Sequence, residues 1–482
     1  MNAWTARAAC GLAVLAAAMV WPAAADQPEA CVTCHAQINP GLVGQWQASK
    51  HAAAGVECSF CHGREQGEVD AFEHHGSYIA TIVTPKNCGR CHEKEFDEQK
   101  GSHHAKAGQI LGSLDNYLGV VIGGQPAVDA GCRQCHGSEV RLGPDKRPTK
   151  DTWPNTGVGR LNPDGSAGSC SACHTRHEFS VRQARQPEAC GKCHLGPDHP
   201  QTEVWNESKH GVMYHADREN MHLEAKVWRA GKEYIAGPTC ASCHMSAAGS
   251  LPVTHEVGER LSWTLRPAVS VKINLVGYAD GAKDDLPGEN AVLPAIGSLF
   301  HIGTAPDRKV TSVLTWQQRR GKMQEVCAQC HQSNFVAGAF AQFDDSVVLY
   351  NDKFAKPAAA IMSALRAKGK LSAADFDTKL GWIYYELWHH QGRRARHGAA
   401  MQGPDYAWWH GLYEVAKTFY TEFLPEVRAV AGEELYKSLL DQYVYSNPGH
   451  LWLRDGMSQD ALAKIQDFYR QRYGQQTPPP GN

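Results

Sequence analysis

The residues with the clearest chemistry in this 482-residue sequence are its cysteines, which recur in the pattern Cys-x-x-Cys-His. All but one of the 17 cysteines belong to eight copies of this pattern. Two thiols so spaced, followed directly by histidine, form the attachment signature of c-type haem, in which the thiols bond to the porphyrin and the histidine ligates the iron. The eight copies are Cys31-Cys34-His35, Cys58-Cys61-His62, Cys88-Cys91-His92, Cys132-Cys135-His136, Cys170-Cys173-His174, Cys190-Cys193-His194, Cys240-Cys243-His244 and Cys327-Cys330-His331.

Zinc binding and redox exchange are the alternatives for a Cys-x-x-Cys pair. Neither needs a histidine after the second cysteine in every copy, and zinc sites combine two such half-motifs. The first cysteines of successive motifs are separated by as few as 20 residues (170 to 190) and as many as 87 (240 to 327), so the chain is not a regular repeat. The pattern predicts eight covalently bound haems.

Histidines outside the motifs are candidates for the second axial position of each iron. The chain has 25 histidines, so 17 remain after the eight motif residues. A lone histidine is ordinarily a surface or core residue, but neutral imidazole is a good iron ligand and iron is dense here. Two similar patterns, Trp46-x-x-Ser49-Lys50-His51 and Trp205-x-x-Ser208-Lys209-His210, each follow a motif. We expect distal ligands at His51, His210, His103 or His104, His177, His255, and His75 or its neighbour His74.

The N-terminus reads as an export signal. Arg7 precedes a short apolar run at 8–21, and Ala23-Ala24-Ala25 forms a small-residue cleavage site. A membrane anchor is the alternative, but the run is shorter than the ~20 residues that span a bilayer. We therefore expect residues 1–25 to be a signal peptide and the mature protein to be periplasmic. The near-balanced charge, 48 Lys and Arg against 50 Asp and Glu, does not indicate a nucleic-acid partner.

The elements that must position these residues are expected to be mainly α-helical. Over 26–335 we expect an octahaem c-type cytochrome domain with little regular sheet, in which porphyrins supply much of the core, and a strand-like stretch at 269–277. Over 336–472 the apolar spacing predicts a bundle of long helices, followed by a disordered tail at 473–482. The expected helices are 354–365, 376–388, 406–423 and 461–473, broken by Gly369, Gly392, Gly403-Pro404 and Pro425.

The order of the motifs, followed by a helical C-terminal part, resembles the octahaem cytochromes of the hydroxylamine oxidoreductase family over essentially the whole mature chain. Pentahaem nitrite reductases are also similar over haems four to eight. In those enzymes lysine replaces the motif histidine of the catalytic haem, whereas all eight motifs here end in histidine. The stretches that carry the resemblance are 131–137, 162–165, 193–200, 240–246, 393–396 and 403–406.

The resemblance implies a reaction site at the fourth haem, with Cys132 and Cys135 as anchors, His136 as proximal ligand and an open distal face. It also implies that Asp198 and His199 lie over that face as an acid–base pair. From the residues alone, Gly-Pro-Asp-His-Pro at 196–200 reads as a surface turn. Oxidising members of the family join one haem covalently to a tyrosine of a neighbouring subunit in a homotrimer, and Tyr406 matches that residue.

The activity implied is oxidation of hydroxylamine to nitric oxide or nitrite, with electrons leaving through bis-histidine haems to a soluble or membrane-associated cytochrome c. Hydrazine oxidation and ammonia-forming reduction of nitrite or hydroxylamine are alternatives, although reductive relatives lack the tyrosine. A pure electron-transfer cytochrome is the non-enzymatic alternative, since 17 spare histidines could cover all eight distal positions.

The cofactor load is directly measurable. Because all 16 cysteines after residue 25 fall in motifs, intact mass spectrometry under denaturing conditions should give the polypeptide from Asp26 plus eight haems. A smaller number of covalent haems, or bound zinc, would contradict the interpretation of the motifs.

Overall fold

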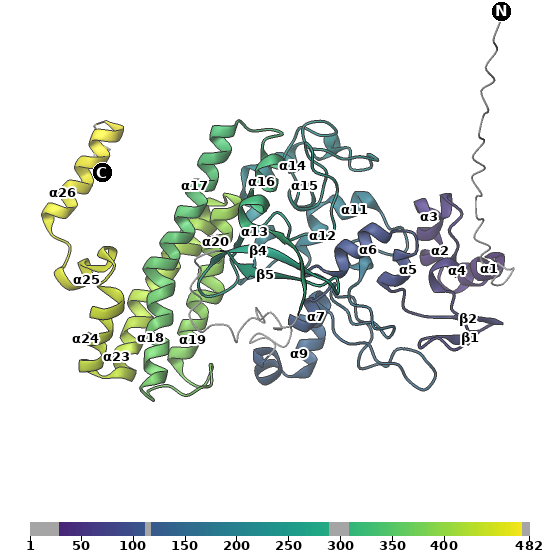
Figure 1. The fold of residues 1–482 in the computed structure, drawn as a ribbon, viewed down its shortest axis with the longest axis horizontal. Helices are drawn as coiled ribbons and strands as arrows, with labels where there is room; N and C mark the ends of the chain where they lie inside the picture. Colours follow the sequence, from purple (N-terminus) through teal and green to yellow (C-terminus); the bar gives the residue numbers. More distant parts are fainter. Residues whose placement is uncertain (1–27, 111–116, 289–307, 475–482) are drawn as a thin grey trace, which may run out of the picture.

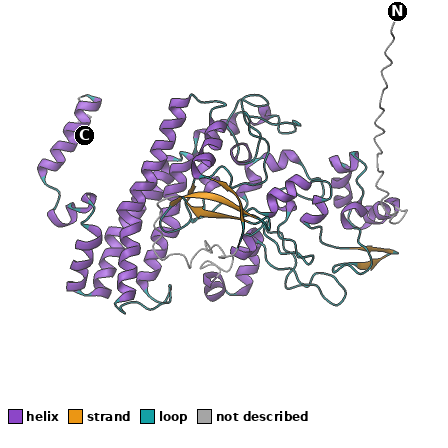
Figure 2. Cartoon of the chain, in the orientation of Figure 1, coloured by secondary structure: helices purple, strands orange, loops and turns teal. Residues whose placement is uncertain are grey.

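The computed structural model describes residues 28–110, 117–288 and 308–474. These residues form a mainly helical structure with a few short strands (Figures 1 and 2), which confirms the expected fold class. The haem-motif segment occupies one end of the molecule and a bundle of long helices the other, with a small sheet between them (Figure 1). The expected signal peptide and residues 475–482 of the expected tail lie outside the described residues.

Short helices carry the haem motifs. Three of them coincide with a motif: α4 (Cys58–His62), α10 (Cys132–His136) and α15 (Cys240–His244). Residues three and four apart share one face of a helix, so this conformation turns both thiols and the histidine towards the same side. The other helices of this half are α1 (Pro28–Ile38), α2 (Pro40–Gln47), α3 (Lys50–Ala53), α5 (Pro85–Gly89), α6 (Glu93–Lys100), α7 (Ala107–Ile110), η1 (Gly119–Gly123), α9 (Gln125–Ala130), η2 (Cys170–Ala172), α11 (Val181–Arg185), α12 (Pro187–Gly191), α13 (Gln201–Glu207), α14 (Lys209–Ala216), η3 (Arg218–Met221) and α16 (Trp316–Cys327).

The strands form two antiparallel sheets within the described residues. A hairpin pairs β1 (Phe72–His74) with β2 (Ser77–Ile79). In the larger sheet, β4 (Val271–Tyr278) is central and pairs with β3 (Trp263–Thr264), β5 (Lys283–Pro287) and β6 (Val310–Leu314). β4 corresponds to the strand-like stretch expected at 269–277, and its β-branched residues suit a pleated, buried surface.

Long helices make up the C-terminal part, and several of them continue through π-helical turns. Their bounds are α17 (Ser333–Tyr350), η4 (Asn351–Ala355), α18 (Lys356–Ala367), α19 (Lys379–Tyr385), η5 (Glu386–Gln391), α20 (Gly392–Met401), α21 (Pro404–Ala407), η6 (Trp408–Tyr413), α22 (Glu414–Thr418), η7 (Phe419–Phe423), α23 (Leu424–Ala431), α24 (Glu433–Leu439), η8 (Leu440–Val444), η9 (Pro448–His450), α25 (Trp452–Asp455) and α26 (Gln459–Tyr473). Fully buried Ile361, Leu365, Phe419, Phe423 and Val427 form part of its apolar core. Among the described residues, no helix is long and apolar enough to cross a membrane.

The structure differs from the sequence expectations about these helices at three points. Pro425 does not break a helix, because η7 runs on into α23 at Leu424. The longest helix, α17, begins at Ser333, directly after the last motif, and was not among the expected helices. Gly392 does not break a helix, because η5 runs on into α20 at this residue. An added Cβ at Gly392 would lie 2.4 Å from the Tyr350 hydroxyl oxygen, so glycine here permits the close approach of α17 and α20.

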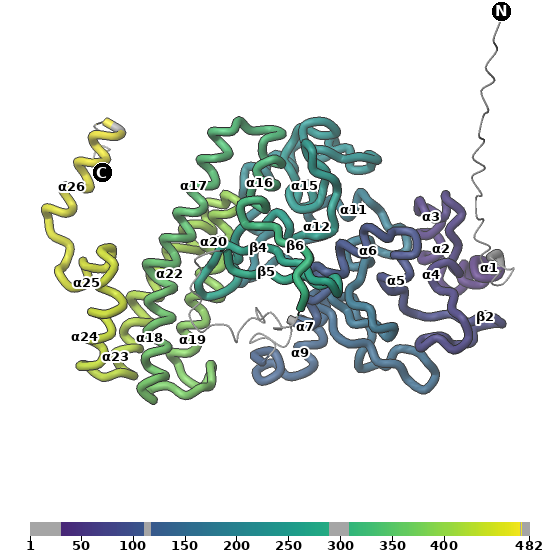
Figure 3. The backbone as a smooth tube through the Cα atoms, viewed as in Figure 1, coloured from purple at the N-terminus to yellow at the C-terminus, as the bar shows by residue number. Residues whose placement is uncertain are grey.

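The two halves differ in how their interiors are filled. The C-terminal helices pack around the apolar core, whereas the motif half encloses a cavity of about 3400 Å³ lined by residues of all eight motifs. Figure 3 shows the contrast in the chain path, which is coiled in the C-terminal helices and largely looped in the haem-motif half. A large cavity bordered by Cys-x-x-Cys-His residues fits the expectation that porphyrins complete this interior.

Candidate functional site

Six motif histidines each face a histidine from another part of the chain. Their ring centroids lie between 6.0 and 6.4 Å apart. Two imidazoles on opposite sides of one metal ion, each nitrogen about 2 Å from it, have centroids ~6 Å apart once both ring radii are added. The spacing therefore fits bis-histidine haem iron. The pairs are His35–His74, His62–His177, His92–His51, His174–His255, His194–His104 and His331–His210.

The two repeated Trp-x-x-Ser-Lys-His patterns form the same local structure. Ser49 caps α3 by accepting a hydrogen bond from the Ala52 amide, and Ser208 caps α14 by accepting one from the Gly211 amide. Each cap places the following histidine, His51 or His210, in the first turn of its helix. The sequence signal thus acts through helix capping, which fixes the direction of the ligand histidine.

Burial keeps several of these imidazoles neutral. Desolvation, followed by the charge of neighbouring histidines, lowers the pKa of His104, His174 and His194 to about 4 each. Only the neutral ring has a lone pair to give to a metal, so these side chains are ready to ligate iron at neutral pH.

The structure separates the alternatives left open among neighbouring histidines. His74 ends β1 and faces His35, whereas His75 is exposed in the turn with a φ of +47°. His104 faces His194, whereas Nε2 of His103 lies 2.7 Å from the Asp285 carboxylate. His103 also lies against Gly258, next to Val257, whose backbone contacts the seventh motif histidine, His244. His103 therefore lies near the seventh motif, with its Nε2 bonded to Asp285.

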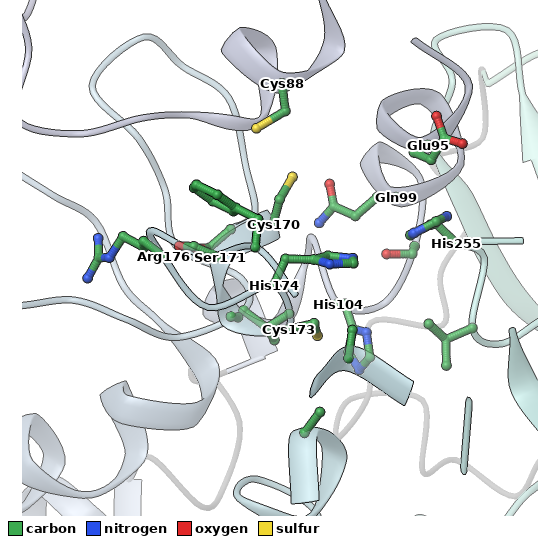
Figure 4. Close-up of a pocket in the computed structure, with 18 of the residues that line it drawn as sticks. Cys88, Glu95, Gln99, His104, Cys170, Ser171, Cys173, His174, Arg176 and His255 are labelled. Atoms are coloured by element: carbon green, nitrogen blue, oxygen red, sulfur yellow. The ribbon is translucent and has the colours of Figure 1, made fainter. Parts of the chain in front are cut away.

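The cavity wall carries polar groups that suit a bound porphyrin. Figure 4 shows His174 and His255 reaching into one part of it, with Gln99 beside them. Both polar atoms of the Gln99 amide are buried and have no hydrogen-bond partner among the described residues. Buried polar atoms normally have partners, so this amide fits a site completed by the polar edge of a cofactor.

Thiols of different motifs adjoin one another and give an order for the haem sites. The thiols lie next to one another in three pairs, Cys88 and Cys170, Cys190 and Cys240, and Cys135 and Cys193. Electrostatic contacts link Cys31 to Cys58, Cys61 to Cys88, Cys173 to Cys190, and Cys243 to Cys327. Numbered by their motifs, the haem sites follow one another in the order 1, 2, 3, 5, 6, 7, 8, and the fourth site lies next to the sixth. Such a row suits stepwise electron transfer.

Asp198 and His199 form an ion pair between the fourth and the sixth motifs, and the His199 ring lies 6.2 Å from that of the sixth motif histidine, His194. His199 Nδ1 lies 2.6 Å from Asp198 Oδ1, and its Nε2 lies 2.9 Å from the Cys193 carbonyl oxygen. Burial opposes both charges, but the hydrogen bond and charge of the partner prevail: the pKa of His199 is raised, and that of Asp198 falls to about 2 with help from Arg393. The charge of His199 also acts on the sulfur of Cys135. His199 therefore lies close to this fourth-motif anchor.

The sequence analysis missed three buried residues from the C-terminal helices that line the same cavity. They are His389, Arg393 and His397, and only 3%, 5% and 7% of their surfaces are exposed. Arg393 donates to Asp198 Oδ2 at 3.1 Å, across the contact between α13 and α20. The available signal was the spacing of His389, Arg393 and His397 at intervals of four, since residues so spaced share one helix face.

Tyr406 lies away from the cavity of its own chain. It stands in α21, where its amide donates to Glu207 Oε1 and its ring is 5.6 Å from that of His410. Beside it, Trp408, Trp409 and Tyr413 are exposed by 52%, 56% and 44%. Tyr406 is thus placed on an aromatic outer face.

Two family models match parts of the chain. Residues 164–283 match "Seven times multi-haem cytochrome CxxCH", and residues 14–63 match "Cytochrome c554 and c-prime". A curated protein of Kuenenia stuttgartiensis, described as a probable nitrite reductase–hydroxylamine oxidoreductase fusion protein, is 27% identical over 347 residues. That alignment covers 64% of this chain but only 34% of the relative, so the chain spans about a third of the relative's length.

Solved structures share the fold at lower identity. A hypothetical multihaem protein aligns with a TM-score of 0.69 and 24% identity over 88% of this chain and 96% of that one. A chain of a reducing HAO-like protein complex of Kuenenia stuttgartiensis aligns with a TM-score of 0.59 and 20% identity over 84% and 85% of the two chains. Together with the motifs and the imidazole pairs, these likenesses define a multihaem c-type cytochrome. Its fold is hydroxylamine oxidoreductase-like, and its haems are bound covalently for redox chemistry.

The hairpin histidines give a sharp test of the ligand assignment. His74→Ala should remove the second ligand from the first-motif iron, so that one low-spin haem becomes high-spin in the absorption and electron paramagnetic resonance spectra. His75→Ala is the matched control and should leave the spectra unchanged, because His75 is exposed. If His75→Ala changed the spectra and His74→Ala did not, then His75 rather than His74 would face the first haem in the haem-loaded protein.

Proposed function

We propose that this chain is a periplasmic octahaem oxidoreductase that oxidises hydroxylamine to nitric oxide or nitrite at its fourth haem and passes the electrons to a cytochrome c. The observation that carries the proposal is the Asp198–His199 ion pair, which is partly buried near the fourth-motif anchor Cys135 and held by Arg393. The resemblance to the hydroxylamine oxidoreductase family and the likeness to a nitrite reductase–hydroxylamine oxidoreductase fusion protein support the substrate class.

The protein's own residues have distinct tasks in this reaction. Cys132, Cys135 and His136 would hold the haem, which supplies the iron for substrate binding and electron removal. His199, fixed by Asp198, exchanges protons with the substrate, and Arg393 holds the second carboxylate oxygen so that the pair keeps its orientation. Conversion of hydroxylamine and water to nitrite releases five protons and four electrons, so a proton acceptor beside the site is essential.

The electrons have an exit through the row of haem sites. The fourth motif meets this row at the sixth through the Cys135–Cys193 contact, and from there the row extends towards the first and the eighth motifs. A cytochrome c could therefore take electrons at either end of the row, away from the fourth haem where the substrate would bind. Haem propionates should add negative charge to a chain whose net charge is −2, which favours a basic partner.

We further propose that Tyr406 joins the fourth haem of a neighbouring subunit in a homotrimer. Its place on an exposed aromatic face, away from its own cavity, supports a role at a subunit contact. Closed rings are the usual form of homo-oligomers, so each subunit would give one tyrosine and receive one.

Ammonia-forming reduction is the second candidate, and one observation favours it. The fold is similar to that of a protein described as a reducing HAO-like complex, at 20% identity. The same Asp198–His199 pair would then deliver protons to the substrate. The direction of the reaction therefore depends on the haem and on Tyr406 rather than on the proton-handling pair.

Replacing either member of the ion pair should cut turnover with the haem content unchanged. We expect His199→Ala and Asp198→Asn to lower the kcat for hydroxylamine oxidation by about 10²–10⁴-fold, the usual cost of a lost acid–base group. The control is His215→Ala, since this exposed side chain is bonded to Asn206 and should not affect turnover. Full activity in both pair variants would move the reaction site to another haem.

The pH profile tests the electrostatic coupling within the pair. His199 acts as a base only when deprotonated, and Asp198 raises its pKa, so activity should rise with pH through a midpoint above the usual histidine value of 6.5. Asp198→Asn removes the negative charge, so the residual activity should have its midpoint at lower pH. A midpoint that does not move would show that another group controls the rate.

The proposed crosslink predicts a covalent trimer. Wild-type protein heated in denaturant should run as a trimer on a gel, whereas Tyr406→Phe should run as a monomer with all haems retained and activity shifted from oxidation to reduction. Tyr413→Phe, on the same exposed face, is the matched control and should stay trimeric. A wild-type monomer with full oxidising activity would contradict the crosslink.

A further inference from the structure

Arg266 brings a positive charge to the wall of the haem cavity without a protein counter-ion. Its side chain lines the cavity and leaves part of its surface uncovered there. Among the described residues, its guanidinium has no hydrogen bond or ion pair, so its N–H donors lack protein acceptors. Arg260 and Arg393 line the same cavity, but each of them donates to protein oxygens.

The surroundings of Arg266 make an unpaired charge costly. Burial lowers the pKa of its guanidinium, because the cation loses hydration there. Arginine nevertheless stays protonated in proteins, so the cost is met by an anion rather than by loss of the charge. The Asp285 carboxylate attracts Arg266, but its two oxygens are already bonded at 2.7 Å, one to His103 and the other to Arg319. The observations therefore call for an anion within the cavity.

The backbone at Arg266 is held in place from α20. Arg393 Nε donates to the Arg266 carbonyl oxygen at 2.8 Å, and Arg396 Nη1 donates to the Pro267 carbonyl oxygen at 2.8 Å. Arg396 also donates to Ser270 Oγ at 2.6 Å, and these donors are buried. A chain fixed at two successive carbonyls keeps the Arg266 side chain at one position of the wall, as a binding residue requires.

The charge of Arg266 acts on two histidines that face each other across one haem site. They are His194 of the sixth motif and His104, whose ring centroids lie 6.1 Å apart. A cation that acts on both imidazoles lies beside the haem that these imidazoles would share. The carboxylates of a c-type haem are its propionate side chains, and a guanidinium matches a carboxylate with two parallel hydrogen bonds.

We propose that Arg266 binds a propionate of the sixth haem and thereby raises the reduction potential of that haem. Reduction adds one electron to the haem, so a positive charge fixed at its edge favours the reduced form. Charge and hydrogen bonds near a haem are among the means by which a protein sets its potential. Arg266 is thus a positioning residue for the cofactor, and this assignment needs no assumption about the substrate.

The consequence for turnover rests on the proposed function. The sixth site lies next to the fourth through Cys193 and Cys135, so electrons removed from the substrate would reach the sixth haem first. In that step the fourth haem is oxidised, the sixth is reduced, and no atoms are exchanged. A higher potential at the sixth haem would draw electrons out of the reaction site and into the row.

Redox titration of the haem-loaded protein, followed by absorption and electron paramagnetic resonance, tests the proposal without substrate. Arg266→Gln should lower the equilibrium constant for reduction of one low-spin haem about tenfold, which is roughly 59 mV for one electron. Arg266→Lys keeps the charge and should retain most of the potential. Arg229→Gln is the matched control and should change no potential, because Arg229 is already paired with Glu233 at 2.6 Å.

A ligand variant identifies the haem that shifts. His104→Ala removes the second imidazole of the sixth site, so the low-spin signal lost in this variant should be the one whose potential falls in Arg266→Gln. A shift confined to another haem would overturn the assignment. Unchanged potentials in both Arg266 variants would overturn it as well.

A free anion is the other source of negative charge for Arg266, and the same titration distinguishes it from a propionate. Sodium formate is a small, redox-inert carboxylate and serves as the probe. A covalently attached haem always presents its propionate, so the potential should not depend on added formate. A potential that varies with formate in the wild type but not in Arg266→Gln would overturn the propionate assignment. The predicted shift in a protein that does not oxidise hydroxylamine would refute the proposed function alone.

Discussion

Two imidazoles that share an iron must stand with their ring centroids about 6 Å apart, and this requirement ties together segments that are distant in sequence. His35 and His74 meet through a hairpin, whereas His174 meets His255 and His210 meets His331 across long loops. Each pair encloses space for a porphyrin, so the motif half can enclose a cavity of about 3400 Å³ where another domain would have aliphatic side chains. Haem attachment thus replaces the hydrophobic core as the main constraint on chain topology.

The sequence predicts a haem ligand well where the residues that fix its geometry lie within a few positions of it, and poorly where they lie far away in the chain. The motif residues and the two Trp-x-x-Ser-Lys-His segments are evident because a helical turn and a serine cap fix their geometry within a few residues. The choice between His74 and His75 is not local, since it depends on where β1 ends and the turn begins. Likewise, the residues at 196–200 alone read as a surface turn, and only the family resemblance placed Asp198 and His199 at the fourth haem, because that position requires the chain to return to the fourth motif.

Helix prediction failed where tertiary contact changed the meaning of a residue. Gly392 reads as a break because glycine weakens an isolated helix, yet here it allows α20 to pass close to Tyr350 on α17. Arg393 and His397 lie in the same helix and line the cavity. The glycine and these site residues all depend on the tertiary packing of α20, which the local sequence does not reveal.

Asp198 lies where the two halves of the molecule meet, and in the proposed reaction this position would give electrons and protons separate routes. On one side, the neighbouring Cys135 and Cys193 connect the site to the row of haem motifs, along which electrons would leave. On the other side, α20 contributes Arg393, which is bonded to Asp198, and η5 contributes His389 to the wall of the same cavity. Electrons and protons that left by one path would have to move together, whereas separate exits would let each be driven by its own acceptor. In the proposed reaction the C-terminal helices would thus complete the site as well as support it.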